Sequence, residues 1–227
     1  MTRPLIACLI FFCLCCVYAS SQTHPPAAKS AAGTAPPTAV IETTAGKLTC
    51  TLFPGKAPIG VANFAGLARG TKDWTNPQTG RKMHGVPLYN GTVFHRVIPE
   101  FMIQGGDPLG TGTGDPGFKF KNETSPDLLF DLPGRLAYAN AGPDTNGSQF
   151  FITEVAYPSL NGGYTIFGQC DDPSVEVVKK ISRLPRNAND RPDDPPKIVK
   201  ITILHYAAHA PVHHAPAKPA AKKTPPQ

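Results

Sequence analysis

The sequence contains few of the side-chain combinations on which covalent or metal-dependent catalysis depends. Cys50 and Cys170, the two cysteines beyond the N-terminal segment, lie in no C-x-x-C pair and beside no histidine, which argues against a catalytic thiol. The polar residues of its two most distinctive motifs, quoted below, follow no pattern typical of a Ser-His-Asp triad, of paired catalytic carboxylates or of a metal site. These absences argue against covalent and metal chemistry at that site, and no cofactor is implied.

An excess of positive charge is also missing from the central part of the chain, although the formal net charge is +6. All acidic residues lie between Val40 and Tyr206, and five of the 22 basic residues lie outside that span, which leaves 17 basic against 16 acidic residues. No basic stripe with interleaved aromatic residues is visible there. We therefore expect no nucleic-acid partner.

A long apolar run is found at the N-terminus, from Leu5 to Tyr18. Arg3 precedes it and Ala19 offers a small residue near a cleavage point, so residues 1–21 are predicted to be a cleavable signal peptide. The run is too short for a convincing membrane span. Leu5-Ile6-Ala7-Cys8 resembles a lipid-attachment motif, but most of the apolar run follows its cysteine instead of preceding it, so lipoprotein processing is disfavoured. We expect a periplasmic or secreted protein without stable membrane insertion, and a retained anchor is the alternative.

Four of the six cysteines lie in that predicted signal peptide, which leaves Cys50 and Cys170. An oxidising compartment would allow a disulfide between them, but the sequence does not show how far apart their Cα atoms lie. We expect two separate buried thiols that pack as small apolar side chains. A disulfide remains the alternative.

The two ends of the chain differ in composition from its middle. Residues 22–39 are rich in alanine and proline and are predicted to be a disordered linker. Residues 207–227 form an Ala/Pro/Lys/His tail without apolar periodicity, which also predicts disorder. Between them, residues 40–206 are long enough for one domain with a substantial core.

Two helices and a series of short strands are predicted within residues 40–206. Pro58 begins a helix that Gly70 ends, and Asp172 caps a second helix. Asp73 to Val86 is predicted to be a polar loop that carries Trp74. The predicted strands are Val40–Thr43, Lys47–Phe53, Thr92–Ile98, Met102–Gln104, Gly134–Asn140, Gln149–Thr153, Tyr164–Gln169 and Lys197–His205. This pattern indicates a mainly β fold, a closed antiparallel β-barrel capped by two α-helices.

Two stretches place hydrogen-bonding side chains inside strand-like apolar runs. They are FHRVIPEFMIQGGD, residues 94–107, and LAYANAGPDTNGSQFFI, residues 136–152. A protein interior does not bury arginine, glutamine and asparagine without partners, because each unpaired polar group costs free energy. The two stretches therefore predict an apolar groove with a few fixed polar groups.

Both stretches resemble the signature blocks of the cyclophilin family of peptidyl-prolyl cis-trans isomerases, and the resemblance extends from about Val40 to Tyr206. It implies an eight-stranded barrel and an isomerase that accelerates X–Pro rotation during the folding of exported proteins. The implied partners are proline-containing peptides and unfolded client proteins. We expect the protein to be a monomer.

Rotation about an X–Pro amide needs neither a nucleophile nor a metal. Its barrier, about 18–20 kcal/mol for a peptide bond, arises because the nitrogen lone pair is delocalised into the carbonyl. A fixed donor aimed at the prolyl nitrogen favours the localised lone pair of the twisted state, so the interaction strengthens as the bond twists. No proton is transferred, and no bell-shaped pH profile is expected.

The resemblance assigns roles to individual residues. Arg96 matches the family's catalytic arginine, and His95 beside it is expected to be structural support. The resemblance places the proline ring among Phe101, Met102, Phe151 and Leu160, the peptide backbone on Gln104, Asn140 and Gln149, and Ala139 and Ala141 along the groove.

Two positions depart from the family's pattern. The tryptophan that often precedes the leucine matched by Leu160 is Ser159 here, and a histidine that commonly lines the site is Tyr164. By analogy both positions lie on the rim of the site. We expect catalysis to survive and binding of the cyclic peptide cyclosporin to be weaker.

Two other hypotheses remain for these motifs. A proline-directed binding module, or a holdase chaperone, would use the same groove with little turnover, but binding alone does not require Arg96. Residues 112–117 fit G-x-G-x-x-G, yet no strand-to-helix turn is expected there, so a dinucleotide site is disfavoured. These glycines are expected to supply loop turns beside the groove.

Overall fold

An antiparallel hairpin is the first structural element in the computed structural model, which describes residues 35–207. Strands β1 (Thr38–Thr43) and β2 (Gly46–Leu52) pair from Thr38 opposite Thr51 to Thr43 opposite Gly46. Every second residue of β2, namely Leu48, Cys50 and Leu52, is buried, as expected for a strand with one face in the core. The predicted signal peptide, residues 22–34 of the predicted linker and residues 208–227 of the tail lie outside the described residues.

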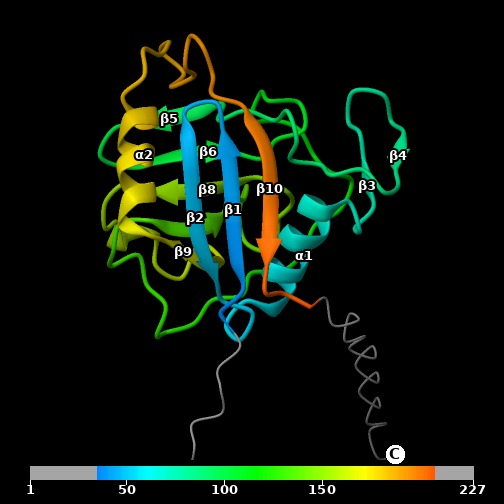
Figure 1. Cartoon of the computed structure of the whole chain (residues 1–227), viewed down its shortest axis with the longest axis horizontal. Helices are drawn as coiled ribbons and strands as arrows, with labels where there is room; N and C mark the ends of the chain where they lie inside the picture. Colours follow the sequence, from blue (N-terminus) through cyan, green and yellow to red (C-terminus); the bar gives the residue numbers. More distant parts are fainter. Residues whose placement is uncertain (1–34, 208–227) are drawn as a thin grey trace, which may run out of the picture. The chain divides into compact units, whose positions relative to one another are not determined.

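Eight strands form one sheet in the order β10-β1-β2-β9-β7-β8-β6-β5, and every neighbouring pair is antiparallel (Figure 1). The remaining strands are β5 (Arg96–Ile98), β6 (Met102–Gly105), β7 (Arg135–Tyr138), β8 (Phe150–Thr153), β9 (Ile166–Cys170) and β10 (Ile198–Leu204). Several are shorter than the sequence predicted, because the residues at their ends turn into loops. The mainly β class and the eight strands are confirmed.

The end strands β10 and β5 are not paired with each other in the part of the chain that the structure describes. One isolated bridge, Val93 opposite Lys197, joins the segments that precede them. The main-chain N–H of Phe94 donates to Pro196 at 3.0 Å beside this bridge. The sheet is therefore an open, curled half-barrel, and the prediction of a fully closed barrel is not confirmed.

Two α-helices pack against the sheet, as predicted (Figure 1). Helix α1 (Pro58–Arg69) lies beside β10 and ends at Gly70, whose φ of 74° is left-handed. Helix α2 (Asp172–Ser182) lies beside β2 and β6. Its cap is Asp171 and not the predicted Asp172, because the Asp171 carboxylate accepts from the main-chain N–H of Ser174 at 3.0 Å. No helix within residues 35–207 is long and apolar enough to cross a bilayer.

The segment from Asp73 to Val86 is more ordered than the predicted polar loop. Two short strands, β3 (Trp74–Thr75) and β4 (Lys82–Met83), pair with each other outside the main sheet. Trp74 is buried, and its indole N–H donates to the carbonyl of Val86 at 2.9 Å. Burial of this large ring gives the segment its own anchor.

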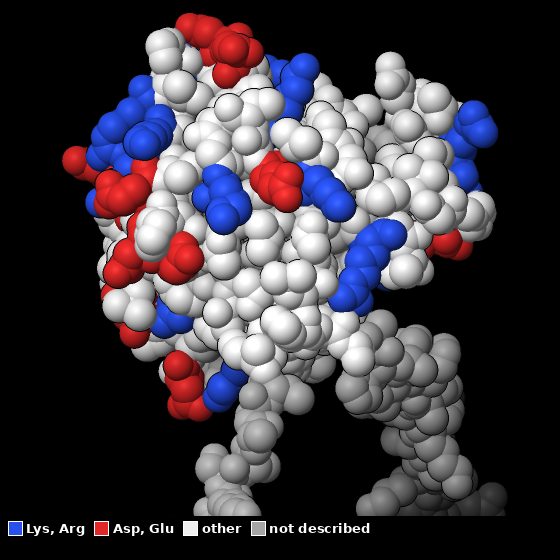
Figure 2. Space-filling view, viewed as in Figure 1, with Lys and Arg blue, Asp and Glu red and all other residues white. Residues whose placement is uncertain are grey.

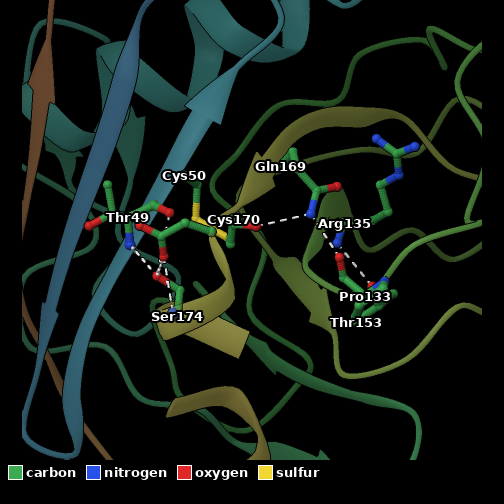
Figure 3. The surroundings of a disulfide bond; sticks show 9 residues. Thr49, Cys50, Pro133, Arg135, Thr153, Gln169, Cys170 and Ser174 are labelled. Atoms are coloured by element: carbon green, nitrogen blue, oxygen red, sulfur yellow. Dashed lines mark hydrogen bonds between the residues drawn. A yellow bond between two sulfur atoms is a disulfide. The ribbon is translucent and has the colours of Figure 1, made fainter. Parts of the chain in front are cut away.

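Cys50 and Cys170 form a disulfide, which corrects the expectation of two separate thiols (Figure 3). They face each other across β2 and β9, with Cα atoms 3.8 Å apart. The next residues in register are joined by a main-chain hydrogen bond from Asp171 to Thr49 at 3.1 Å, so the cysteines occupy a non-hydrogen-bonded position, where Cα atoms approach closely. Both residues are buried.

Apolar side chains gather on both faces of the sheet. The larger cluster, which includes Val97, Ile103 and Phe150, is the main core. A smaller cluster contains Met102, Phe130, Ala137, Phe151 and Ile166. Because side chains alternate along a strand, Phe150 and Phe151 belong to different clusters. The candidate site lies on the face of the smaller cluster.

Candidate active site

Three of the predicted site residues stand in one row across three strands. Arg96 of β5 is in register with Gln104 of β6, and Gln104 is in register with Phe151 of β8. Residues in register on antiparallel neighbours project to the same face. The sheet therefore brings the arginine, one amide and one pocket phenylalanine together, although the chain separates them.

Phe151 belongs to an apolar cluster that includes the residues predicted to bind the proline ring. Met102 and Phe151 are buried in it, while Phe101, Leu160 and Tyr164 pack against it with part of their surface exposed. The rings of Phe151 and Tyr164 meet edge to face, with centroids 5.4 Å apart. The arrangement provides a buried apolar floor with accessible walls, as a small apolar ring requires.

A second group of predicted residues lines a groove of about 300 Å³ next to this row. The amide nitrogen of Gln104 donates to the side-chain oxygen of Gln149 at 3.0 Å. The amide nitrogen of Gln149 donates in turn to the carbonyls of Gly112 and Gly114. Further lining residues are Ala139, Asn140 and Ala141. Gln104 thus connects the arginine, the apolar cluster and the groove.

The side chain of Asn140 braces the groove. Its amide nitrogen donates to the carbonyl of Gly163 at 3.0 Å, and its oxygen accepts from the main-chain N–H of Gly142 at 3.2 Å. The prediction had this residue hydrogen-bonding the peptide backbone. Each end of the side chain therefore makes one internal hydrogen bond, and its role in binding a peptide stays a prediction.

The guanidinium of Arg96 is open to a hollow of about 320 Å³, where it lies with Gln104, His95, Arg191 and others. Its side chain is 43% exposed, and it donates no hydrogen bond to any of residues 35–207. Its nearest acid is Asp190, whose carboxylate oxygen lies 3.8 Å from Nε of Arg96. The guanidinium therefore keeps donors available for a ligand.

His95 lies beneath this hollow and is buried. Burial lowers the pKa of its imidazole below the usual range, although the carboxylate of Asp107 opposes this shift. The imidazole is therefore neutral at neutral pH. A buried neutral ring agrees with the supporting role expected for this residue.

The glycine-rich loop beside the groove is organised by the buried Asp107. Burial raises the pKa of this carboxyl group, but main-chain N–H groups of Leu109, Gly114, Gly112 and Thr111 lower it more, so the pKa lies below its usual value. A Cβ at Gly114 would lie 1.8 Å from the Asp107 carboxylate. Glycine at this position therefore permits the close approach, and the loop holds no strand-to-helix turn.

Some members of the site were missed by the sequence analysis. Phe130 stacks on Phe151 with ring centroids 5.8 Å apart, and Tyr157 lies against Phe101 at 4.4 Å. Both come from irregular segments, where no strand or helix period indicates which side chains are buried. Phe130 and Tyr157 are recognised as part of the site only because the structure places their rings against Phe151 and Phe101.

The two positions that depart from the family's pattern lie beside the apolar cluster. Ser159 is exposed in a short 3₁₀ helix, η1 (Pro158–Leu160), next to the half-buried Leu160. Tyr164 contacts both Phe130 and Phe151 through its ring. Position 159 therefore carries no aromatic side chain, whereas position 164 carries the ring of a tyrosine.

Fold and site together define a class of protein: a curled antiparallel sheet with a partly accessible apolar cluster, an amide-lined groove and an accessible arginine. A sequence model described as "Cyclophilin type peptidyl-prolyl cis-trans isomerase/CLD" matches residues 38–203. "Peptidyl-prolyl cis-trans isomerase A" of Mycobacterium tuberculosis is 54% identical over 167 residues, which cover 73% of this chain and 91% of that protein. "Peptidyl-prolyl cis-trans isomerase B" of Streptomyces anulatus is 51% identical over 156 residues, which cover 68% of this chain and 89% of that protein.

A solved structure agrees with these sequence relatives. The Cryptosporidium parvum cyclophilin-type isomerase, crystallised in the presence of the dipeptide Ala-Pro, has a TM-score of 0.62 and 37% identity, covering 73% of this chain and 98% of that one. The chain therefore belongs to the cyclophilin-type peptidyl-prolyl cis-trans isomerases. It is an isomerase.

Proposed function

We propose that the protein binds proline-containing segments of client proteins across the row Arg96–Gln104–Phe151 and twists the X–Pro bond there. The observation that carries this proposal is the register of the three residues on neighbouring strands. It sets an accessible cation in one row with Phe151, which belongs to the apolar cluster. The Ala-Pro dipeptide named with the Cryptosporidium relative supports the same class of ligand.

In this proposal the pocket of Met102, Phe151 and their neighbours holds the proline ring, and the amide-lined groove holds the chain on the acyl side. The guanidinium of Arg96 donates to the prolyl nitrogen as the bond twists. The planar amide has its nitrogen lone pair delocalised and accepts this donor poorly, so the interaction favours the transition state over the ground state. A preorganised cation needs little reorganisation during the step.

A binding module or holdase with little turnover is the second candidate. It would require the apolar cluster and the groove, which the protein has, but it gives no reason for a cation whose guanidinium donates no hydrogen bond within residues 35–207. The exposed guanidinium of Arg96 therefore favours turnover over binding alone.

A protease-coupled cis-to-trans assay on a short Ala-Pro peptide tests the proposal. Arg96→Ala should lower turnover by about 10²–10³-fold, as the loss of a transition-state donor does elsewhere, with a smaller loss of peptide affinity. Arg81→Ala removes an exposed arginine from the turn between β3 and β4, outside the main sheet, and should leave turnover unchanged. A wild-type protein that binds the peptide but does not turn it over would favour the module instead.

We further propose that the enzyme acts on exported proteins outside the cytoplasm, as a monomer, with residues 40–206 as its catalytic domain between a linker and a tail. The charged and apolar pattern of residues 1–21 supports export. The Cys50–Cys170 disulfide adds independent support, because such bonds persist in oxidising compartments. Acidic and basic side chains are intermixed on the face shown in Figure 2, which does not favour a nucleic-acid partner.

Cell fractionation with N-terminal sequencing of the full-length protein tests export. The expected result is a protein in the periplasm or medium whose first residue lies near position 20–22. Recovery with Met1 intact in the membrane pellet would favour a retained anchor, and recovery in the cytoplasm would contradict export.

A further inference from the structure

The cation assigned to catalysis is accompanied by an acid from a distant part of the chain. The segment between α2 and β10 passes the end of β5 (Figure 1). The main-chain N–H of Val97 donates to the carbonyl of Asp190 at 2.8 Å. Because β5 is the last strand of the sheet, this bond attaches the segment to an otherwise unpaired strand edge, next to Arg96.

The backbone around Asp190 is built to present this residue. Asp190 has a φ of 60°, which is left-handed, and its N–H donates to Asn187 at 3.0 Å. The side-chain oxygen of Asn187 accepts from the N–H groups of Asn189 and Arg191. Arg191 also donates from its guanidinium to the carbonyl of Gly110 in the glycine-rich loop. The tip of the segment is therefore held on two sides, and a non-glycine residue accepts an unfavourable backbone conformation there.

The carboxylate of Asp190 lies between two arginines. One oxygen is 3.8 Å from Nε of Arg96, and the other accepts from Nε of Arg186 at 3.4 Å. The distance to Arg96 is too long for a hydrogen bond, so the attraction is electrostatic. Both side chains of this pair are partly exposed, and pairs of this kind contribute little to folding stability.

The direction of the contact matters more than its strength. Asp190 approaches Arg96 at Nε, next to the aliphatic stem, and the terminal nitrogens donate to no acceptor within residues 35–207. Attraction at Nε restricts rotation of the guanidinium while the terminal N–H groups remain free for a substrate. A flexible, exposed arginine would otherwise lose side-chain entropy each time it reached the twisted bond.

We propose that Asp190 is a positioning residue for Arg96: it orients the guanidinium toward the substrate before the X–Pro bond twists. This inference rests on the proposed catalytic role of Arg96. It adds that the segment joining α2 to β10, although it contributes no residue to the proline pocket, sets the rate of the on-enzyme step.

Asp190→Asn tests the proposal, because asparagine tolerates the left-handed backbone and nearly preserves the side-chain volume while removing the charge. Magnetisation-exchange NMR on a short Ala-Pro peptide measures binding and on-enzyme isomerisation separately. The isomerisation rate should fall about fivefold, the size expected for the loss of one exposed ion pair, while peptide affinity changes less than about twofold. The Arg96 Nε–H resonance should show increased mobility in the variant.

Two matched variants separate positioning from a structural effect. Asp194→Asn removes the same charge from an exposed position of the same segment and should keep the wild-type isomerisation rate. Asp193→Asn removes another exposed charge there and should also keep it. High salt should slow the wild type toward the rate of Asp190→Asn and leave that variant nearly unchanged.

The outcomes distinguish this inference from the proposed function. If Arg96→Ala loses turnover while Asp190→Asn keeps it, the positioning role is refuted and the catalytic role stands. If Asp194→Asn slows isomerisation as much as Asp190→Asn, the effect comes from the charge of the segment and not from Asp190, and the positioning role is again refuted. If Arg96→Ala retains turnover, both proposals fall.

Discussion

The two halves of the sheet are held together in different ways. In the long-strand half, β10, β1, β2 and β9 have five to seven residues each, and the disulfide joins β2 to β9. In the short-strand half, β5, β6, β7 and β8 have three or four residues each. Here carboxylates beside the loops complete the structure: Asp107 binds four main-chain N–H groups, and Glu154 accepts from that of Glu100.

The difference indicates where the molecule separates stability from function. Long hydrogen-bonded strand pairs and a disulfide need no specific side chain at the surface. The long-strand half can therefore be rigid without contributing residues to the site. Short strands leave room for loops, and loops bring polar groups to the site face. The candidate active site therefore lies in the half whose structure depends on individual polar contacts.

The largest expected effect comes from two adjacent residues in the short-strand half. Phe150→Ala removes a ring from the main core and should cost about 3–5 kcal/mol of stability, with peptide affinity of the folded protein unchanged. Phe151→Ala, the same substitution on the other face, should cost less, because partly exposed neighbours can collapse toward the gap, but it should abolish measurable peptide binding. Urea unfolding and peptide titration measure the two quantities. Equal losses of affinity would show that the two faces are not independent.

A smaller effect is expected from the disulfide, which tests the long-strand half. Replacing both Cys50 and Cys170 by alanine opens a loop with a sequence separation of 120 residues and should lower the free energy of unfolding by about 2–5 kcal/mol. Turnover at 25 °C should not change, because the site lies on other strands. Thermal melts and the isomerase assay give the result. A parallel loss of turnover would mean that the two halves are coupled.

The contrast also explains what the sequence could predict. Alternation of Leu48, Cys50 and Leu52 located β2 closely, and Pro58 with Gly70 located α1. Long regular elements repeat the same local signal several times, and their ends are marked by residues with restricted or permissive backbones. The site residues were assigned by the resemblance of the two motifs to the family, and the register of the strands then shows that Arg96, Gln104 and Phe151 share a row.

Contacts between distant segments were not predictable in this way. Nothing near Cys50 indicates that Cys170 lies opposite, since their pairing depends on the order of strands in the sheet. The same holds for Asp190 beside Arg96 and for Phe130 beneath Phe151. Each partner comes from an irregular segment or another strand, so its position follows from the whole fold and not from its neighbours in the chain.

The pH dependence of stability should depend on a buried carboxylate in the short-strand half. Glu154 is 2% exposed, lies 2.6 Å from Arg183, and accepts from Ser182 and from the main chain of Glu100. Burial raises its pKa, but these donors lower it more, so the folded pKa lies below the usual 4.5. The charged form is thus favoured by folding. Its stabilisation is complete above pH 4.5 and is lost as the pH falls through the folded pKa.

Glu154→Gln should lower the free energy of unfolding at pH 7 by about 2 kcal/mol, as expected for hydrogen bonds to a charged group. The gap between variant and wild type should narrow as the pH falls below 4.5. Urea unfolding at several pH values measures it. Glu176→Gln, which affects an exposed pair with Lys179, should change stability by less than about 0.5 kcal/mol. A gap that stays constant down to pH 3 would contradict the assignment.

The smallest expected effect concerns ligand preference at the rim. Ser159 is exposed beside Leu160, so this position offers no aromatic ring and no indole N–H, where the family resemblance implies a tryptophan. Ser159→Trp should strengthen cyclosporin inhibition by about tenfold, since a tryptophan adds both apolar contact area and a donor for a ligand carbonyl. Ser159→Phe supplies the area without the donor and should give an intermediate gain. Turnover of a short peptide should be the same in all three proteins, because the rim lies outside the row of Arg96, Gln104 and Phe151. Inhibition of the unmodified protein as strong as that of a tryptophan-bearing cyclophilin would show that the rim does not set this preference.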